Sequence, residues 1–161
     1  MTDRLSGKVA IVTGAASTTG GVGIGYATAM LFAREGAHVL LVNRSKDRVD
    51  ALCSAITAEG GEASVFVADI SRRDQVAKMI DAAVERYGRL DILFNNVGIQ
   101  PPDSYVDAVE LPEETWDKII NVNLKSRFLM AKYSIPHMRK AGGGVIISSA
   151  SVQGLQSMGG V

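Results

Sequence analysis

Residues 9–25 read VAIVTGAASTTGGVGIG, and this stretch decides the fold. Its first four residues form an apolar run, which predicts a short buried strand, and helical periodicity begins at Ile24. Five glycines lie at this strand–helix junction. Glycines there let the backbone approach a pyrophosphate, whose charge is met by exposed N–H groups at the helix N-terminus. The stretch therefore predicts a phosphate-binding loop in preference to a merely flexible turn. No Lys-Ser or Lys-Thr pair follows, so it is not the P-loop of nucleoside triphosphatases.

The alternation of strand and helix continues along the chain. Short apolar runs predict further strands at 39–42, 65–67, 92–94 and 145–147. Apolar residues at helical spacing predict helices at about 24–35, 49–60, 71–87 and 115–138. Ser71 is the expected N-cap of the third helix. The last helix is apolar nearly all round, so we expect it to be buried on more than one side, with Trp116 in the core. This order predicts an α/β fold, a doubly wound parallel sheet of the Rossmann type with five strands and flanking helices, in a single domain, 1–161.

Composition and charge exclude several classes of protein. Seventeen basic residues balance seventeen acidic ones, so no attraction to nucleic acid or to a membrane surface is expected. The single cysteine, Cys53, cannot form an internal disulfide. No stretch approaches the roughly 18 consecutive apolar residues of a membrane span, and no signal peptide is recognised. His38 and His137 lack metal-ligand spacing. We therefore expect a cytoplasmic domain without a metal site.

Asn43 and Arg44 follow the second strand, at the position where dinucleotide-binding units discriminate between cofactors. An NAD site usually has a carboxylate here to hold the ribose hydroxyls, whereas an arginine can pair with a 2′-phosphate. The chain has no acid at 43 and a cation at 44. This pattern favours NADP(H) over NAD(H), and the missing acid also counts against a methyltransferase. The alternative is that Arg44 is an ordinary solvated arginine.

Several ordered motifs resemble those of the short-chain dehydrogenase/reductase family. The family's TGxxxGxG loop is similar to Thr13-Gly14 followed by Gly23-Ile24-Gly25, here five residues longer. Its NNAG signature is similar to Asn95-Asn96-Val97-Gly98, and its VNL motif to Val122-Asn123-Leu124. Its catalytic serine segment is similar to Ile147-Ser148-Ser149. The resemblance covers essentially the whole chain. It implies an NAD(P)(H)-dependent oxidoreductase that moves a hydride between nicotinamide and a small alcohol or carbonyl substrate.

The resemblance also implies which residues contact the cofactor. The family's acid at the end of the third strand, which contacts the adenine, is similar to Asp69. Gly98 would let the chain pass close to the cofactor ribose, and Asn95 would have a mainly structural role between strands. The implied cofactor-binding residues are Gly14, Ser17, Gly23, Ile24, Gly25, Arg44, Asp69, Ile70, Asn95 and Gly98.

Two catalytic residues are implied in the same way, Asn123 and Ser149. Asn123 is an amide in an otherwise apolar helix, where a buried amide must be hydrogen-bonded; without the resemblance it could not be preferred to Asn121. Ser149 follows the fifth strand, where α/β proteins bind ligands. Its family role is to hydrogen-bond the substrate oxygen, and Ser148 and Ser151 lie nearby. The irregular segment 97–112 supplies three candidates for the substrate pocket, Gln100, Asp103 and Tyr105.

The family's general acid, a tyrosine followed four residues later by a lysine, has no counterpart in these 161 residues. The usual spacing from Ser149 would place that tyrosine near or just after position 162. We therefore expect a truncated reductase whose 161 residues supply the cofactor-binding half and are inactive alone. The alternative is a non-catalytic dinucleotide-binding or interaction module. In a truncated chain the strand at 145–147 and the helix at 115–138 would expose apolar surface. The helix resembles the family's dimer-forming helix, so the complete protein is expected to be a homo-oligomer.

Overall fold

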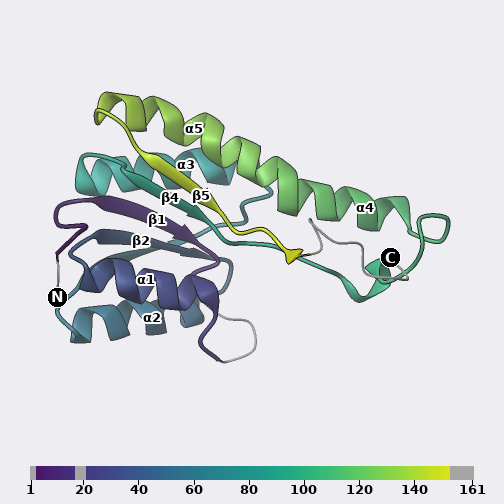
Figure 1. Ribbon diagram of the computed structural model, residues 1–161, viewed down its shortest axis with the longest axis horizontal. Helices are drawn as coiled ribbons and strands as arrows, with labels where there is room; N and C mark the ends of the chain where they lie inside the picture. The colour runs from purple at the N-terminus through teal and green to yellow at the C-terminus, as the bar shows by residue number, and fades with distance from the viewer. Residues whose placement is uncertain (1–2, 17–20, 153–161) are drawn as a thin grey trace.

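The computed structural model describes residues 3–16 and 21–152, and its strands form one parallel sheet (Figure 1). The strands are β1 (Val9–Thr13), β2 (His38–Asn43), β3 (Glu62–Val67), β4 (Ile92–Asn95) and β5 (Val145–Ser148). The helices are α1 (Ile24–Arg34), α2 (Lys46–Ala58), α3 (Arg73–Tyr87), α4 (Glu113–Ile120) and α5 (Ser126–Lys140). A 3-10 turn, η1 (Pro102–Ser104), precedes α4, and a π-helical turn, η2 (Asn121–Lys125), joins α4 to α5. The strand order is β3-β2-β1-β4-β5 with all pairs parallel, which confirms the predicted doubly wound α/β fold.

Alternating residues of the central strands face two separate cores. On one face Ile11 of β1 and Leu40 of β2 pack with side chains of α3 and α5. On the other face Val12 and Leu41 pack with side chains of α1 and α2. Figure 1 shows the same layers, with α1 and α2 on one side of the sheet and α3 and α5 on the other. Because both faces of the central strands are covered, their sequences are continuous apolar runs without polar alternation.

The predicted helix at 115–138 is present, but η2 divides it into α4 and α5. Its expected burial on more than one side is wrong. Trp116, predicted to lie in the core, is 55% exposed, and Leu124 and Phe128 are exposed as well. The reason is geometric: α5 packs against α3 and the sheet, whereas α4 projects beyond the strand ends (Figure 1). Within the described residues, no helix has the length and apolarity needed to cross a bilayer.

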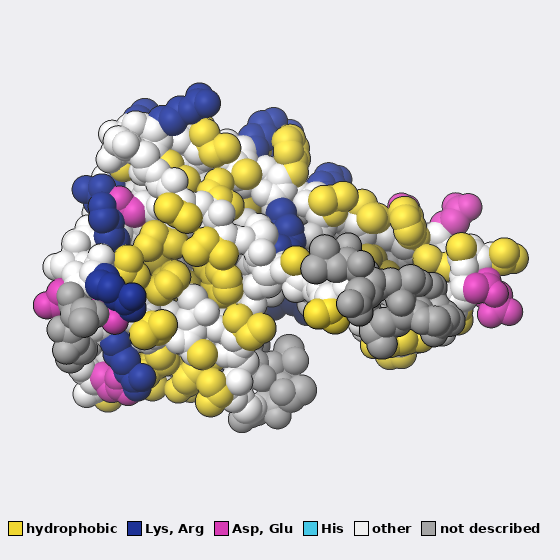
Figure 2. Space-filling model, in the orientation of Figure 1, with side chains coloured by type: hydrophobic (Ala, Val, Ile, Leu, Met, Phe, Trp, Pro, Cys, Tyr) yellow, Lys and Arg dark blue, Asp and Glu magenta, His cyan; other side chains and the backbone are white. Residues whose placement is uncertain are grey.

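β5 is the edge strand on the α5 side of the molecule. Val145, Ile146 and Ile147 are 56%, 37% and 42% exposed, which is the exposed apolar surface expected for this strand. Figure 2 shows hydrophobic side chains gathered on the side of the molecule where β5 lies. Within the described part of the chain β5 pairs with β4 alone, so one of its edges has unpaired backbone groups.

The start of α3 differs from the prediction. The helix begins at Arg73, and its N-cap, Arg72, makes no side-chain capping hydrogen bond. Ser71 is not the cap, because its N–H and its hydroxyl both donate to Asp69 Oδ1, at 2.9 and 2.7 Å. The serine therefore closes a turn that holds Asp69 at the end of β3. The predicted helix end is confirmed, since Gly88 adopts the left-handed conformation with φ of 79°.

Candidate functional site

A cleft of about 600 Å³ opens at the carboxyl ends of the strands. The chain moves outward from β1 to β3 and then returns to β4, so β1 and β4 form the switch point at which such sheets bind ligands. Most of the predicted cofactor-binding residues line this cleft: Gly14, Gly23, Ile24, Gly25, Arg44, Asp69, Ile70 and Gly98. Ser17 lies outside the described residues. Asn95 is buried and is not part of the lining.

Gly14 and Gly25 bring the loop after β1 against the first turn of α1. Gly14 has a φ of +62°, a conformation that costs other residues energy. A Cβ atom on Gly25 would lie only 2.1 Å from the Gly14 carbonyl oxygen. The N-cap of α1, Gly23, provides no side-chain cap. The N-terminal N–H groups of α1 are therefore available to an anion in the cleft.

Asn96 connects the ends of β1, β4 and β5, and the prediction of site residues missed it. Its Nδ2 donates to the Gly14 carbonyl at 3.3 Å, and its Oδ1 accepts from the Ser149 hydroxyl at 3.1 Å. Its backbone N–H donates to Thr13 Oγ1 at 3.1 Å. Asn96 also lines the cleft. The available signal was its place as the second asparagine of the motif that resembles NNAG.

Asn43 and Arg44 form the edge of the cleft after β2. The Asn43 Nδ2 donates to the Ala16 carbonyl at 3.0 Å, and its Oδ1 accepts from the Ser45 N–H at 3.0 Å. Asn43 occupies the position where an NAD site usually has a carboxylate. Its side chain instead hydrogen-bonds to the glycine-rich loop. Arg44 is exposed, and among the described residues it forms no ion pair. Its charge nevertheless acts on Asp69.

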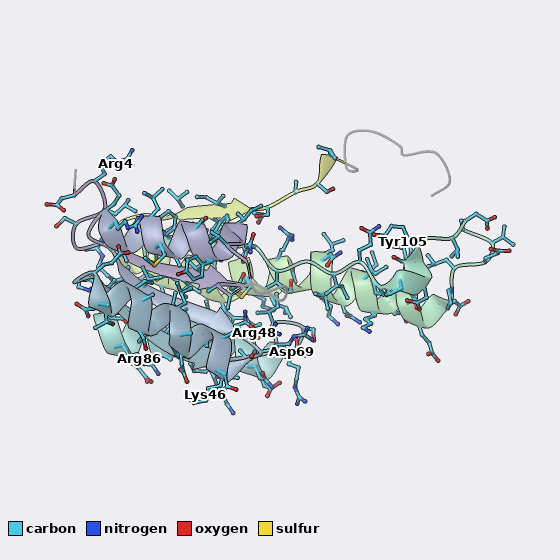
Figure 3. All side chains as sticks on the ribbon, turned by 90° about the horizontal axis from the view of Figure 1, so that it is seen from below. Arg4, Lys46, Arg48, Asp69, Arg86 and Tyr105 are labelled. Atoms are coloured by element: carbon cyan, nitrogen blue, oxygen red, sulfur yellow. The ribbon has the colours of Figure 1, made fainter. Side chains whose placement is uncertain are left out.

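Asp69 lies on the cleft wall after β3, and Figure 3 shows it near the middle of the molecule, between the end with Arg4 and Arg86 and the projecting part with Tyr105. Burial alone would raise the pKa of its carboxyl group. Hydrogen bonds from Ser71 and the charges of Arg44 and Arg72 outweigh burial, so the net pKa is lowered. The Asp69 N–H donates to Gln75 Oε1 at 2.7 Å, which fixes the backbone as well. Asp69 therefore presents a charged, oriented carboxylate to the cleft.

Asn95 and Ser149 join the carboxyl ends of β4 and β5. The Asn95 Nδ2 donates to Ser148 Oγ at 3.3 Å, and its carbonyl accepts from the Ser149 N–H at 2.9 Å. Asn95 is only 4% exposed, which agrees with a structural role between strands. The Ser149 hydroxyl is half-buried and is directed to Asn96. Ser149 thus stands next to the cleft wall, although it is not part of the cleft lining.

Asn123 lies in the π-helical turn η2, and both the oxygen and the nitrogen of its side-chain amide bind the backbone of Ile99. Its Oδ1 accepts from the Ile99 N–H and its Nδ2 donates to the Ile99 carbonyl, each at 2.8 Å. The amide thus pairs with the backbone as a neighbouring strand would. Ile99 itself lines the cleft. Asn123 therefore supports the cleft wall through both of these amide hydrogen bonds.

The three candidates for a substrate pocket separate in space. Gln100 lines the cleft. Asp103 accepts a hydrogen bond from Thr115 and ties the irregular segment to α4. Tyr105 is 61% exposed, and Figure 3 shows it beside the projecting α4, away from Asp69. The prediction also missed Lys118 and Val122, which line the cleft from the helical side. Among the described residues, no three His, Cys, Asp or Glu side chains gather as a metal site would require.

The short-chain dehydrogenase family model matches residues 8–161. Among curated relatives, the 3-oxoacyl-[acyl-carrier-protein] reductase FabG of Thermotoga maritima is 41% identical over 152 residues, 94% of this chain and 58% of that protein. The levodione reductase of Leifsonia aquatica is 36% identical over 160 residues, 98% of this chain and 57% of that protein.

Solved structures give the same result. A short-chain dehydrogenase/reductase from Burkholderia xenovorans matches with a TM-score of 0.91 at 40% identity, over 98% of this chain and 62% of that chain. A 7α-hydroxysteroid dehydrogenase complexed with NADH and 7-oxo glycochenodeoxycholic acid matches with a TM-score of 0.87 at 30% identity, over 98% and 58%. The chain thus spans less than two thirds of the length of these relatives. The family match over nearly its whole length shows that this chain belongs to the short-chain dehydrogenase/reductase family of oxidoreductases.

Proposed function

We propose that these 161 residues supply the NADP(H)-binding half of an oxidoreductase that transfers a hydride between nicotinamide and a small alcohol or carbonyl substrate. The observation that carries the proposal is the cleft at the switch point of the sheet, with the Gly14–Gly25 contact on one wall and Asp69 on another. The open N-terminus of α1 suits the pyrophosphate. The oriented Asp69 carboxylate suits the adenine, and Gly98 suits the ribose.

The preference for NADP(H) rests on the end of β2. The Asn43 side chain is hydrogen-bonded to the Ala16 carbonyl and the Ser45 N–H, and it carries no negative charge. Arg44 lies at the cleft edge without an ion pair among the described residues, so its guanidinium is available to a 2′-phosphate. A carboxylate here would instead favour the ribose hydroxyls of NAD. A similar structure with a bound nucleotide, the 7α-hydroxysteroid dehydrogenase, contains NADH, so the test must compare both cofactors.

The chain's own residues account for binding and positioning. Bound nicotinamide would supply or accept the hydride. Asn123 holds the cleft wall through Ile99, and Ser149, anchored to Asn96, is the residue we assign to the substrate oxygen. A proton donor such as a Tyr–Lys pair typically contributes about 10²- to 10⁴-fold in rate. Because the 161 residues contain no Tyr-x-x-x-Lys sequence, we expect nucleotide binding with little or no turnover from this chain alone.

The test titrates NADPH and NADH into the chain and follows the fluorescence of the nucleotide and of Trp116. We expect NADPH to bind more tightly than NADH. Arg44→Ala should lower NADPH affinity about 10- to 100-fold, the value of a charge-assisted contact, and change NADH affinity less than about twofold. Arg139→Ala, which removes the same charge from the exposed end of α5, is the matched control. Equal losses for both nucleotides would refute the assignment of Arg44 to the 2′-phosphate.

A non-catalytic dinucleotide-binding or interaction module is the second candidate, and the exposed apolar surface of β5 and α4 is the observation in its favour. Binding alone does not separate the two candidates, because both predict it. Turnover does: the module predicts no carbonyl reduction either by these residues or by a longer chain that contains them. Reduction of a 3-oxoacyl thioester or a simple ketone by a longer chain would exclude the module.

A further inference from the structure

Arg127, in the first turn of α5, uses its guanidinium group on backbone carbonyls. Its Nε donates to the Asn123 carbonyl at 2.6 Å. Its Nη1 and Nη2 reach the carbonyls of Asn95 and Val97 at 3.5 and 3.4 Å, longer and weaker contacts. The side chain is half-buried, and among the described residues it forms no ion pair with a carboxylate. Removing a cation from water costs free energy, and neutral acceptors offset that cost only when several of them hydrogen-bond to it.

The three carbonyls belong to segments that meet at the cleft. Asn95 ends β4, and its carbonyl also accepts the Ser149 N–H from the end of β5. Val97 lies in the cleft lining. Asn123 lies in η2 and in turn pairs with Ile99. Arg127 and Asn123 therefore hold the same stretch, residues 95–99, one at its beginning and the other at its end.

The chemistry of the side chain suits this task. A guanidinium group is planar and presents five donors in a fixed arrangement, so it can bind several carbonyls at once. A lysine has a single nitrogen on a flexible stem and cannot span the same three acceptors. The π-helical turn shifts backbone hydrogen bonds out of the α-helical register, and the Arg127 Nε binds the Asn123 carbonyl inside that turn.

We propose that Arg127 is a positioning residue for the dinucleotide cleft, because its guanidinium fixes the wall at residues 95–99 to the turn that carries Asn123. This rests on the proposed function insofar as the ligand is NADPH. Loss of Arg127 should lower NADPH affinity by loosening the wall and should act through the same backbone as loss of Asn123. The two residues are therefore expected to be energetically coupled.

The experiment measures NADPH affinity of the whole chain for Arg127→Met, Arg127→Lys, Asn123→Ala and the double variant Arg127→Met with Asn123→Ala. Arg139→Met, on the exposed end of the same helix, is the control. Each single loss should lower affinity about tenfold, and the double variant about 10- to 30-fold instead of the hundredfold expected for independent residues. Arg127→Lys should lie between wild type and Arg127→Met. A double variant that loses a full hundredfold, or an Arg127→Met variant that binds as wild type does, would overturn the proposal.

Amide hydrogen exchange supplies a readout that does not need the nucleotide. The Ile99 N–H is protected by Asn123 Oδ1, so Arg127→Met should speed its exchange about tenfold while the β2 amide of Leu40 changes little. Unchanged exchange at Ile99 would overturn the proposal even if the variant binds NADPH poorly. If wild type fails to bind NADPH but Ile99 responds as expected, the proposed cofactor is wrong and the positioning role stands.

Discussion

β1 and β5 have similar sequences and very different surroundings. β1 (VAIVT) is buried along its whole length, whereas all residues of β5 (VIIS) are exposed. β1 has strands on both sides and helices on both faces. Among the described residues β5 has β4 on one side only. The comparison shows that an apolar run is enough to predict a strand, whereas the free energy that the strand contributes depends on what covers it.

The largest expected effect is a cavity on the covered side. Ile11 is fully buried between strand neighbours and the α3–α5 layer, so Ile11→Ala should lower the free energy of unfolding by about 4 kcal/mol. Ile146→Ala in β5 removes the same atoms from a side chain that is already 37% exposed and should cost about 1 kcal/mol or less. Urea denaturation of both variants measures the difference.

Equal losses at the two positions would contradict this comparison. They would mean that β5 is covered in solution, for instance by a second copy of the chain. Sedimentation at several concentrations would then distinguish the cases, because coverage by a second copy makes stability depend on concentration. Ile146→Lys is a useful third variant, since a charge on an exposed edge strand should reduce association without a large loss of stability.

The same comparison explains which parts of the fold could be predicted. The apolar runs of β1, β2 and β4 and the helix end at Gly88 were recoverable because they depend on local periodicity and local backbone conformation. The exposure of Trp116 was not, because an apolar helical pattern does not reveal whether a second layer exists. Ser71 was misassigned as a cap because serine bonds equally well to a neighbouring carboxylate, and Asp69 was available two residues away.

The residues of the candidate site also differ in whether local sequence predicts them. Gly14 and Gly25, predicted to bind the cofactor, line the cleft, because glycine clusters indicate close backbone approach. Their contact with a cofactor stays a prediction. Asn96 and Arg127 were missed because their partners lie on segments distant in sequence. Apart from the motif that resembles NNAG, no local pattern distinguishes an asparagine that hydrogen-bonds to solvent from one that joins strands. The preference for Ser149 among neighbouring serines came from the family resemblance alone, and it stays a prediction.

The second prediction concerns the close contact between Gly14 and Gly25 in the cleft wall. Gly25→Ala should lower NADPH affinity more than about 100-fold, near 3 kcal/mol, because its Cβ would lie 2.1 Å from the Gly14 carbonyl oxygen. Backbone on both sides must shift to relieve that contact. Gly21→Ala is the matched control, since a Cβ there meets nothing within 4 Å, and it should bind within about threefold of wild type. The same fluorescence titration measures both variants. Tight binding by Gly25→Ala would show that the nucleotide does not use this loop.

The smallest effect is expected at Asp91, on the border between the covered half of the sheet and β5. Its carboxylate accepts from the Val9 N–H at 3.0 Å and from two nitrogens of Arg89 at 2.8 and 2.6 Å, and its backbone carbonyl accepts the Val145 N–H. Burial tends to raise its pKa, but the Arg89 and Val9 hydrogen bonds and the nearby positive charges lower it overall. Asp91→Asn keeps the shape, loses the charge, and should cost about 2 kcal/mol at pH 7.

Because the pKa of Asp91 is lower in the folded than in the unfolded chain, its charge stabilises the fold above the unfolded pKa of about 4. That contribution is lost as pH falls through the lower, folded value. The stability gap between wild type and Asp91→Asn should therefore be constant from about pH 7 to 5 and shrink as pH falls below about 4, since the protonated carboxyl resembles the amide. Urea denaturation of both proteins between pH 7 and 2.5 measures the gap. A gap that persists unchanged at low pH would mean that hydrogen-bond geometry, and not charge, connects β1 to the β4–β5 edge.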